Sequence, residues 1–476
     1  MRVLQVCSEI YPLLKTGGLA DVAGALPQAL RRHGCDVRVL LPGFPAIKRG
    51  VAALQPLPGH PALLRGQLPD GTVCYLIDAP ELYEREGNPY SGPDGRAYED
   101  NHRRFALLGR VACLLAEGRD PEWSAQIVHG HDWHAGLAPA YLKAAWRTHG
   151  RRVAASVHTV HNLAFQGTFG LNVLGELGLP GDFYQQHGLE FHGQVSYMKA
   201  GLQYADRVTT VSPTYAREIQ GEEQGCGLDG VLRARSADLS GILNGVDDQV
   251  WNPLRDPLIP HRYGAGDLAS KRQCRSALQQ EFGLATQAQA PLFGIVSRLT
   301  EQKGVNLLLA GLPDLLARGG QLVVLGSGEP ALEAGLREAA AVHPRSVAVR
   351  VGYDENLAHR IVAGADVLMV PSRFEPCGLT QLYALKYGTL PLVRRVGGLA
   401  DTVVDSALEN LAEGSATGFV FERFDLPDYV AALRRAFALY RREGEWREVQ
   451  QRAMAQDFGW NAAAAQYAAL YRRLLP

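Results

Sequence analysis

The sequence alternates from end to end between short apolar runs and longer segments with the periodicity of amphipathic helices. In the first half the apolar runs occupy residues 2–7, 37–41, 73–78, 126–129, 153–158 and 207–211. In the second half they occupy residues 292–298, 321–326, 347–351, 366–371 and 390–393. Runs that are apolar on both faces are typical of parallel strands covered by helices on both sides. The alternation therefore predicts an α/β fold built from doubly wound, Rossmann-like sheets.

A chain of 476 residues is too long for one ordinary hydrophobic core. Between the two series of strands, residues 244–266 are rich in Asn, Asp, Gly and Pro, which is the composition of a linker. We therefore expect an N-terminal Rossmann-like domain over 1–243, a C-terminal one over 244–455 and an Ala-rich helix in 456–476. A deep ligand cleft is expected between the two domains.

The composition excludes several classes of partner. With a net charge of −1 and a pI near 6.9, the chain has no global field that would recruit nucleic acid or an anionic membrane. No run reaches 18 apolar residues, so no membrane span is expected, and the first residues enter a strand directly, which leaves no room for a signal peptide. The seven cysteines are dispersed without a C-x-x-C pair, which indicates reduced thiols and a cytoplasmic protein.

The segment "KTGG", residues 15–18, lies between the first strand and a helix expected over 19–32. Gly17 and Gly18 allow close approach of a ligand to the backbone, and the helix N-terminus presents free N–H groups. Lys15 precedes the glycines, whereas the usual nucleotide loop has its lysine after them. By itself the segment is equally well interpreted as a tight turn with a solvated lysine.

Histidines gather after two other predicted strands. The stretch "IVHGHDWHAG", residues 127–136, and the stretch "SVHTVHN", residues 156–162, both emerge at the carboxyl edge of a doubly wound sheet, where ligands bind. One interpretation is a zinc site, and hence a metal-dependent hydrolase, formed by His129, His131, His158 and His161. Against it, adjacent strand residues face opposite ways, and no acidic or cysteine ligand falls at a standard spacing. Hydrogen-bonding or acid/base roles fit imidazole equally well.

Two loops of the second half have the features of an anion site. Arg298 and Lys303 lie five residues apart after one strand, and Glu375-Pro376 precedes a helix expected to begin near Gly378. No Asp-x-Asp occurs to recruit a divalent cation, so fixed cations and helix N-termini would have to hold a diphosphate without metal.

Taken together, these stretches resemble one family. "KTGGLADVAGALP", "HDWHAG", "VHTVHNLAFQG", "NGVD" with "WNP", "SRLTEQKG" and "SRFEPCGLTQLYALKYGTLPLVRRVGGLADTV" occur in order and span almost the whole chain. They resemble the bacterial glycogen synthases and plant starch synthases, which are retaining glucosyltransferases of the two-domain GT-B architecture. The resemblance implies transfer of glucose from ADP-glucose to the nonreducing end of an α-1,4-glucan such as glycogen. It implies no cofactor, no metal, no nucleic acid and no membrane, and a final helix that crosses back to the N-terminal domain.

The resemblance also implies roles for individual residues. The implied catalytic residues are His161 at the reacting centre, Glu375 on the glucose hydroxyls, and Arg298 and Lys303 on the diphosphate. The donor site would further include Lys15, Gly17, Gly18, Asn244, Cys377, Gly378, Leu379 and Thr380. The sugar and acceptor side would be lined by Glu9, Asp21, Tyr90, Asp132, Trp133 and His134.

Three alternatives to this interpretation stay open. A sibling transferase could use UDP-glucose or another acceptor, because nucleobase contacts are not legible in the sequence. A glucan-binding protein that has lost catalysis would keep the fold, although the presence of Lys15, His161 and Glu375 argues against it. Within the enzyme interpretation, Glu375 could act as a covalent nucleophile. We favour front-face displacement, in which Glu375 positions the sugar and the leaving diphosphate takes the acceptor proton.

Overall fold

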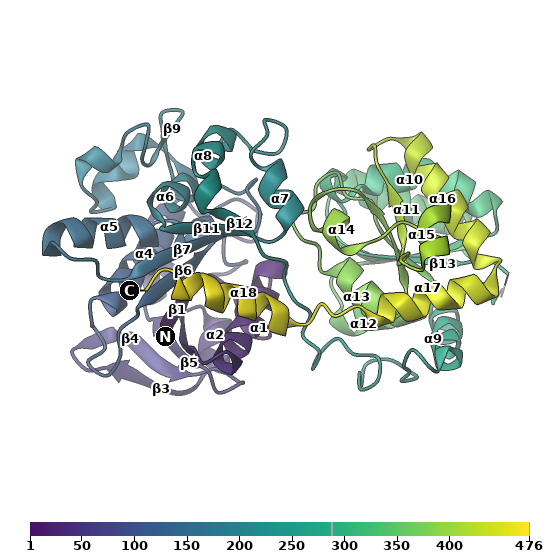
Figure 1. The fold of residues 1–476 in the computed structure, drawn as a ribbon, viewed down its shortest axis with the longest axis horizontal. Coiled ribbons are helices and arrows are strands. Elements are labelled where there is room, and N and C mark those ends of the chain that lie inside the picture. The colour runs from purple at the N-terminus through teal and green to yellow at the C-terminus, as the bar shows by residue number, and fades with distance from the viewer. Residues whose placement is uncertain (287–288, 476) are drawn as a thin grey trace. The chain divides into compact units, whose positions relative to one another are not determined.

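The computed structural model of the protein describes residues 1–286 and 289–475, and its chain divides into two compact units (Figure 1). Unit 1 comprises Met1–Gly245 and the chain from Trp460 onward, and unit 2 comprises Val246–Gly459. The sequence places the first boundary between residues 243 and 244 and the second between 455 and 456. The compact units divide two and four residues later, because Asn244 and Gly245 continue unit 1 and residues 456–459 continue unit 2.

Unit 1 is built on a nine-stranded sheet in the order β12-β11-β7-β6-β1-β2-β5-β4-β3. The seven strands from β12 to β5 are parallel, whereas β4 pairs antiparallel with both β5 and β3. The chain runs outward in one direction through β2 and β5 and in the other through β6, β7, β11 and β12, so the order reverses between β1 and β6. The strands are β1 Arg2–Val6, β2 Asp36–Pro42, β3 Ala52–Leu57, β4 His60–Gln67, β5 Val73–Ile77, β6 Ile127–His131, β7 Ala155–Val160, β11 Arg207–Thr210 and β12 Leu239–Gly241.

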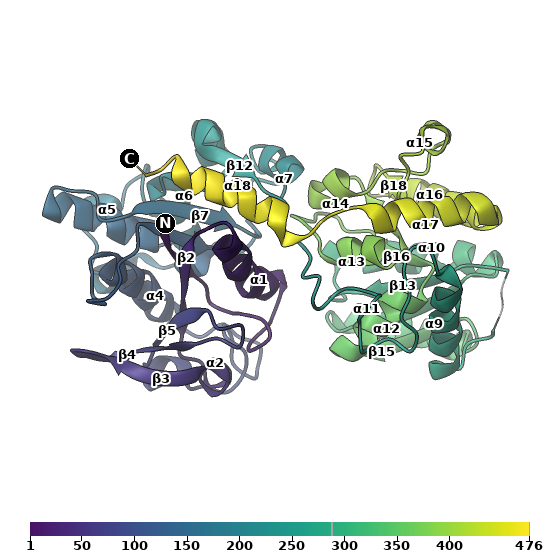
Figure 2. The same ribbon diagram turned by 60° about the horizontal axis from the view of Figure 1, so that its bottom comes forward.

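Helices cover both faces of this sheet. On one face α1, Gly18–Arg32, lies beside the C-terminal helix α18, Trp460–Arg472, and both pack on apolar residues of β1, β2, β6 and β7 (Figures 1 and 2). On the other face lie α4 Asn101–Ala116, α5 Ala138–His149 and α6 Tyr197–Tyr204. The C-terminal helix therefore belongs to the core of unit 1, although some 215 residues of unit 2 separate it from the rest of that unit along the chain.

Shorter elements complete unit 1. The helices are α2 Pro45–Gly50, α3 Pro80–Tyr83, α7 Pro213–Glu218 and α8 Asp229–Ala234, and a separate sheet holds β8 Thr168–Phe169, β9 Glu190–Phe191 and β10 Gln194–Ser196. Single 3₁₀ turns are η1 Trp133–Ala135, η2 Leu171–Glu176, η3 Gly181–Phe183 and η4 Ser236–Asp238. At the start of α7, the Ser212 side chain accepts a hydrogen bond from the Tyr215 amide at 2.8 Å, so Ser212 is the N-cap of this helix.

Unit 2 contains a six-stranded parallel sheet in the order β15-β14-β13-β16-β17-β18. The order reverses between β13 and β16, which is the doubly wound arrangement of a dinucleotide-binding sheet. Its strands are β13 Leu292–Val296, β14 Gln321–Gly326, β15 Val347–Val351, β16 Val367–Val370, β17 Leu390–Arg394 and β18 Phe419–Phe421. Its helices are α9 Leu268–Glu281, η5 Glu301–Lys303, α10 Val305–Ala317, α11 Pro330–Val342, α12 Glu355–Gly364, α13 Thr380–Lys386, α14 Gly397–Thr402, α15 Leu408–Glu413, α16 Leu426–Tyr440 and α17 Glu443–Ala455.

In the segment with linker composition, residues 244–266, all residues from Val246 onward are part of unit 2. Trp251 is buried between the rings of His359 and Tyr383, with centroids 3.7 and 3.9 Å away. Ile259 and Tyr263 are buried in the same core. The interpretation as a plain linker was therefore wrong for most of the segment, because a few large apolar side chains anchor a backbone that is otherwise rich in turn-forming residues.

The α/β fold with two doubly wound sheets, predicted from the apolar runs, is confirmed, and every predicted strand overlaps one in the structure. Within residues 1–286 and 289–475 no helix combines the length and apolar character needed to cross a membrane. All seven cysteines are free thiols.

Candidate active site

The chemistry-bearing loops of each unit leave its sheet where the strand order reverses. In unit 1 the segment from Cys7 follows β1 and the segment from Asp132 follows β6. In unit 2 the segment from Ser297 follows β13 and the segment from Pro371 follows β16. Ligands of doubly wound sheets bind at this switch point, outside the carboxyl ends of the strands. Each unit thus offers one half-site, described separately below.

The carboxylate of Glu9, three residues after β1, holds the "KTGG" loop by hydrogen bonds. Its oxygens accept hydrogen bonds from the Thr16 amide at 2.5 Å, the Thr16 hydroxyl at 2.8 Å and the Gly17 amide at 3.3 Å. Gly17 is the N-cap of α1, so Glu9 holds the loop at the N-terminus of that helix. The Lys15 ammonium forms a 2.9 Å ion pair with Asp21 in the first turn of α1. Glu9 and Asp21, both predicted to contact ligand, therefore also build the loop that carries Lys15.

Tyr90 reaches the same place from the long loop between α3 and α4. Its hydroxyl donates to Glu9 at 2.8 Å and lies 2.8 Å from the Ser8 hydroxyl, while its ring stacks on His134 at 4.5 Å. Burial and the neighbouring Glu9 carboxylate raise the pKa of Tyr90 well above its usual value, so it stays a neutral donor.

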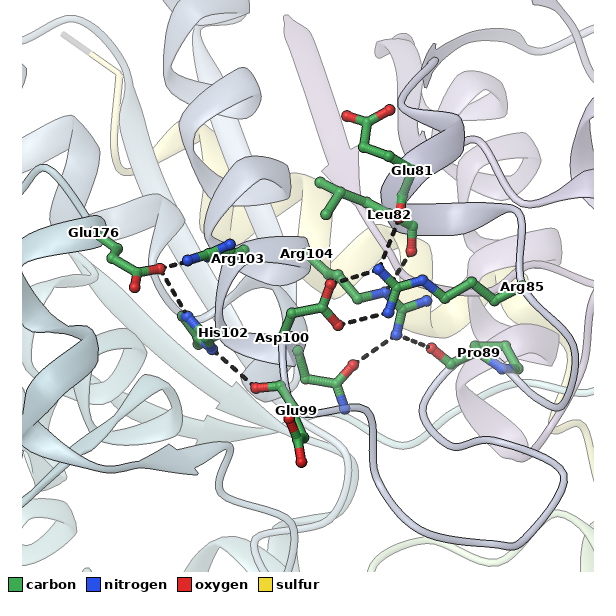
Figure 3. A network of polar contacts seen from close by, with 11 residues as sticks. Glu81, Leu82, Arg85, Pro89, Glu99, Asp100, His102, Arg103, Arg104 and Glu176 are labelled. Atoms are coloured by element: carbon green, nitrogen blue, oxygen red, sulfur yellow. Dashed lines mark hydrogen bonds and ion pairs between the residues drawn. The ribbon is translucent and has the colours of Figure 1, made fainter.

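The buried guanidinium of Arg104 holds this loop in place. Figure 3 shows it reaching the carbonyl oxygens of Leu82 and Pro89, at 2.8 and 2.9 Å. At the far end of the loop Asp100 pairs with Arg85 at 2.6 Å. Sequence reasoning did not find Arg104, because nothing in its local pattern distinguishes it from a solvated helix arginine.

Asp132 has a left-handed backbone, with φ of 55°, directly after β6. Such a conformation is uncommon outside glycine and marks a position that the surrounding structure enforces. Its carboxylate accepts from the amides of His161 at 2.7 Å and Asn162 at 3.3 Å, so it ties the loop after β6 to the loop after β7. Burial raises the pKa of Asp132 to about 7, although the two backbone amides oppose the shift.

Trp133 and His134 lie in a cluster of rings at this loop. Trp133 packs on His134 at 4.2 Å and on Phe105 at 4.8 Å between centroids. Gly167, which has a positive φ, leaves room for the Trp133 ring, because a Cβ at that position would lie 2.2 Å from it. The rings of Trp133, His134 and Phe105 thus form one packed cluster beside the loop after β6.

His129, His131 and His161 form hydrogen bonds with one another or with neutral partners rather than a metal cage, whereas both ring nitrogens of His158 are buried without a hydrogen-bond partner. His131 Nδ1 lies 2.8 Å from His161 Nε2, and its Nε2 lies 2.6 Å from the Gln5 amide oxygen. His158 lies on the opposite face of β7, packed against Gly201, where a Cβ would approach its ring to 2.5 Å. Among the residues that the structure describes, no group of three His, Cys, Asp or Glu is placed to hold a metal ion. The four-histidine zinc site considered above is therefore not assembled.

All these imidazoles are neutral. Burial lowers the pKa of His161 to about 3 and that of His158 to about 4, and it places the pKa values of His129, His131 and His134 well below the ordinary value. A neutral imidazole donates at one nitrogen and accepts at the other. The cluster can therefore orient a ligand hydroxyl at neutral pH without contributing charge.

In unit 2 the structure brings Lys303 and Glu375 together at the switch point. The Lys303 ammonium lies 2.6 Å from the Glu375 carboxylate, which also accepts from the Ser372 hydroxyl at 2.9 Å. Glu375 is 7% exposed, so this ion pair is largely removed from water. Arg298 is exposed, and its guanidinium donates to Gln302 at 3.2 Å. The two predicted cations thus occupy one loop, with one paired to the predicted carboxylate.

Glycines at three positions allow close backbone packing in this half-site. A Cβ on Gly398 would lie 2.2 Å from the Cys377 carbonyl oxygen, and one on Gly397 would lie 1.9 Å from that of Glu375. A Cβ on Gly304 would lie 2.0 Å from the Pro371 carbonyl. The backbone that carries Glu375 therefore packs directly against the first residues of α14 and α10. The helix expected near Gly378 begins at Thr380, after Gly378 with φ of 72° and Leu379 as N-cap.

Comparison with known proteins agrees with this arrangement. Residues 2–234 match the family described as "Starch synthase catalytic domain", and residues 290–438 match "Glycosyl transferases group 1". The chain is 58% identical to a glycogen synthase of Leptothrix cholodnii, with all of both chains covered. It is 55% identical to a glycogen synthase of Francisella tularensis subsp. novicida, covering 100% of this chain and 99% of the relative. The chain belongs to the glycogen synthase family.

A solved structure of a plant member of the wider group has the same fold. The catalytic domain of starch synthase IV from Arabidopsis thaliana, bound to ADP and acarbose, superposes with a TM-score of 0.90. It is 31% identical and covers 99% of this chain and 98% of that one. The glycogen synthase family and the GT-B fold implied by the motifs are therefore confirmed.

The predicted site residues of this glycogen synthase family member divide between the two units. Unit 1 gathers Glu9, Lys15, Gly17, Gly18, Asp21, Tyr90, Asp132, Trp133, His134 and His161, and unit 2 gathers Arg298, Lys303, Glu375, Cys377, Gly378, Leu379 and Thr380. Asn244, predicted for the donor site and placed in the C-terminal domain, belongs to unit 1, where it is 7% exposed after β12. Ser372 was missed, although it stands in the quoted motif three residues before Glu375.

Proposed function

We propose that this protein is a glycogen synthase that transfers glucose from ADP-glucose to the nonreducing end of an α-1,4-glucan with retention of configuration. The observation that carries the proposal is full-length similarity to curated glycogen synthases, at 58% identity to that of Leptothrix cholodnii, together with intact half-sites at both switch points. The structure of the Arabidopsis relative contains ADP and acarbose. It therefore supports a nucleoside diphosphate and a glucan-like molecule as ligands of this protein as well.

The donor diphosphate would be held by fixed cations. A cation about 4 Å from a unit negative charge contributes on the order of 4 kcal/mol of raw attraction at an effective dielectric near 20. Arg298 and Lys303 in unit 2 and Lys15 in unit 1 together would stabilise the charge that develops on the leaving ADP. We propose that this requires no metal ion.

The acceptor hydroxyl would attack the anomeric carbon on the face from which ADP departs, and the departing phosphate oxygen would take its proton. Glu375 suits a positioning role, because its carboxylate is already engaged by Lys303 at 2.6 Å and by Ser372 at 2.9 Å. A carboxylate so engaged is a weaker nucleophile but a well-oriented acceptor for glucose hydroxyls. His161 would contact the donor sugar, and the ring cluster of Trp133 and His134 would face the glucan. The residues proposed for the reaction come from both units, so neither unit alone would carry it out.

The activity is tested with purified protein, glycogen and radiolabelled donors in direct competition. We expect incorporation of glucose from ADP-glucose in large excess over UDP-glucose, undiminished after exhaustive chelation. Preference for UDP-glucose would assign the protein to a sibling transferase, and loss of activity with the chelator would overturn the metal-free mechanism. No incorporation from either donor would overturn the proposal. As a cytoplasmic enzyme it should also be active with all of its cysteines reduced.

A further inference from the structure

The two donors that hold the Glu375 carboxylate converge on the same oxygen. The Lys303 ammonium lies 2.6 Å from Oε2, and the Ser372 hydroxyl donates to that oxygen at 2.9 Å. The other oxygen, Oε1, reaches solvent and has no hydrogen-bond partner within residues 1–286 and 289–475. A carboxylate oxygen accepts more than one hydrogen bond, so both donors fit Oε2 at once. The carboxylate thus has one oxygen held by the protein and one left open.

The two donors differ in how firmly the fold holds them. Ser372 is fully buried, whereas the Lys303 side chain is 18% exposed and carries its charge at the end of a long, flexible stem. A lysine ammonium has three N–H groups, and Glu375 engages one of them. A bound diphosphate would therefore pull on Lys303 and not on Ser372.

The backbone is fixed on both sides of Ser372. The carbonyl oxygen of Pro371, before it, packs so closely on Gly304 that a Cβ there would lie 2.0 Å away. The amide of Arg373, after it, donates to the Gln302 carbonyl oxygen at 2.8 Å. Both contacts are made with the loop after β13. Because a serine side chain has a single rotatable bond to its oxygen, this backbone sets the position of the hydroxyl.

The remaining freedom of Glu375 lies in its side chain. Its backbone carbonyl accepts a hydrogen bond from the Gly398 amide at 3.3 Å, and Pro376 disfavours helical backbone angles at the residue before it. A single donor would hold one carboxylate oxygen but let the group turn about it, whereas two donors at that oxygen restrict the rotation. Without the Ser372 hydroxyl, the carboxylate would turn both oxygens toward the Lys303 ammonium, because the charge attracts either oxygen equally.

We propose that Ser372 is a positioning residue for the transfer reaction. It keeps Oε2 in place while Lys303 engages the donor diphosphate, so that Oε1 of Glu375 stays directed at one hydroxyl of the donor sugar. This role rests on the proposed function, in which Glu375 orients the glucose and Lys303 contacts the diphosphate. Ser372 therefore serves recognition of the sugar and not binding of the nucleotide.

The experiment compares kcat/KM of the full chain for ADP-glucose with that for its 2-, 3-, 4- and 6-deoxy analogues, with glycogen as acceptor. Wild type should discriminate against the analogue that lacks the hydroxyl facing Oε1 by about 10- to 100-fold, the range for one hydrogen bond to a charged group. In Ser372→Ala this ratio should fall by about two- to tenfold, the range for one neutral hydrogen bond. The other ratios, and the Kd for ADP from calorimetry, should stay as in wild type.

Glu375→Gln identifies the same hydroxyl independently. Because Lys303 only donates, it draws the new amide oxygen to the Oε2 side, and the amide N–H₂ group takes the place of Oε1. The hydroxyl that faced Oε1 then loses its charged acceptor, so its analogue should show the largest fall in discrimination.

Ser406→Ala is the matched control, since it removes a hydroxyl of unit 2 that is 6% exposed and donates to the Gly418 carbonyl oxygen at 2.8 Å. It should leave every ratio as in wild type. A ratio of two kcat/KM values does not depend on the fraction of folded protein, so lower stability in either variant does not affect the comparison.

Unchanged discrimination in Ser372→Ala overturns the role of Ser372, and so does an equal change for every analogue, which would mark a general loosening of the loop. A fall for a different analogue from the one identified by Glu375→Gln, or a weaker Kd for ADP, would contradict it as well. These outcomes leave the proposed function standing, because the wild type is active in each. A wild type that transfers glucose from no donor would instead refute the proposed function, and the role of Ser372 with it.

Discussion

Lys15 is held 2.9 Å from Asp21 and lies over the ring of Tyr11 at 5.4 Å. If Lys15 contacts the donor as proposed, the diphosphate would have to draw its ammonium away from the Asp21 carboxylate, which otherwise keeps the lysine near the N-terminus of α1. The glycines beside it leave the backbone close to any donor. Under the proposed function, a lysine placed before the glycines would thus be kept near the helix N-terminus for a donor phosphate.

Lys15→Gln should lower kcat/KM for ADP-glucose by about 10- to 100-fold, the range for losing one hydrogen bond to a charged group. The thermal midpoint should change little, because a partly exposed ion pair contributes at most about 1 kcal/mol. Steady-state kinetics and calorimetry measure the two effects.

Lys48→Gln is the control for this substitution. Lys48 is also a unit 1 lysine paired with carboxylates, and its side chain is 20% exposed against 22% for Lys15. It should leave the kinetics unchanged. Equal losses in both variants would show that Lys15 has no specific contact with the donor.

Sequence reasoning was most successful for single residues that end a predicted strand. Asp132, Arg298 and Glu375 all follow such strands, so their placement at the sheet edge followed from topology alone. Gln5 and Tyr471 could not be predicted in this way, because they are in contact yet 466 residues apart. Arg104 and Gly398 act through tertiary contacts that leave no periodic signal in the sequence.

At the scale of elements, α14 fixes the loop that carries Glu375. Gly398→Ala would place a methyl group 2.2 Å from the Cys377 carbonyl oxygen, which is backbone and cannot rotate away. The loop must shift, so kcat should fall at least about tenfold, and overpacking should destabilise unit 2 by about 1–3 kcal/mol.

Gly444→Ala provides the comparison for Gly398→Ala. Gly444 lies in the first turn of α17, and a Cβ there meets nothing within 4 Å. It should leave activity unchanged and stability equal or slightly higher, because alanine restricts the unfolded chain. A wild-type kcat in Gly398→Ala would contradict the close packing of the Glu375 loop against α14.

The segment 246–266 is an element without helix or strand, and Trp251 is its main anchor. Trp251→Ala removes a ring stacked between His359 and Tyr383, so it should destabilise unit 2 by about 3–5 kcal/mol. Hydrogen exchange by mass spectrometry should show increased exchange in α12 and α13 with unit 1 unaffected. Protection unchanged in α12 would mean that the segment is an ordinary linker after all.

The strands that the sequence did not predict share a physical reason. β3 and β4 carry mostly exposed or half-buried side chains and pair antiparallel at the edge of the sheet, so they lack the continuous apolar run of a buried parallel strand. β8, β9, β10, β12 and β18 are two or three residues long, which is too short for any periodicity. The central strands were predictable because they are buried on both faces, so nearly all of their residues are apolar.

At the scale of the whole molecule, the two units differ in how they respond to acid. Unit 1 buries five neutral imidazoles, whose pKa values are lowered in the fold by removal from water: His129, His131, His134, His158 and His161. Each binds a proton on unfolding below its ordinary pKa of about 6.5, so stability is present above that pH and is lost as the pH falls. Each contributes about 1.4 kcal/mol per pH unit, or about 2 kcal/mol at pH 5.

Two groups act in the opposite direction. The pKa of Asp132 is raised to about 7, so the folded state keeps a proton there and regains about 3 kcal/mol between pH 7 and pH 5. In unit 2 burial opposes protonation of His359, but its bonds to Asp256 and Glu355 outweigh that effect and raise its pKa. The stabilisation by His359 is therefore fully present below about pH 6.5. It is lost only as the pH rises through the raised pKa of His359.

Unit 1 should therefore lose about 7 kcal/mol between pH 7 and pH 5, which is comparable with the whole stability of a typical domain, while unit 2 is spared. Hydrogen exchange of the full chain at stepwise lower pH should show β6, β7 and α18 exposed together before β13 and β16. His158→Leu removes one of the five proton-binding sites without removing a hydrogen bond, so the pH slope should fall by about 1.4 kcal/mol per unit. An equal slope in that variant, or earlier exposure of unit 2, would show that the buried imidazoles do not govern the acid response.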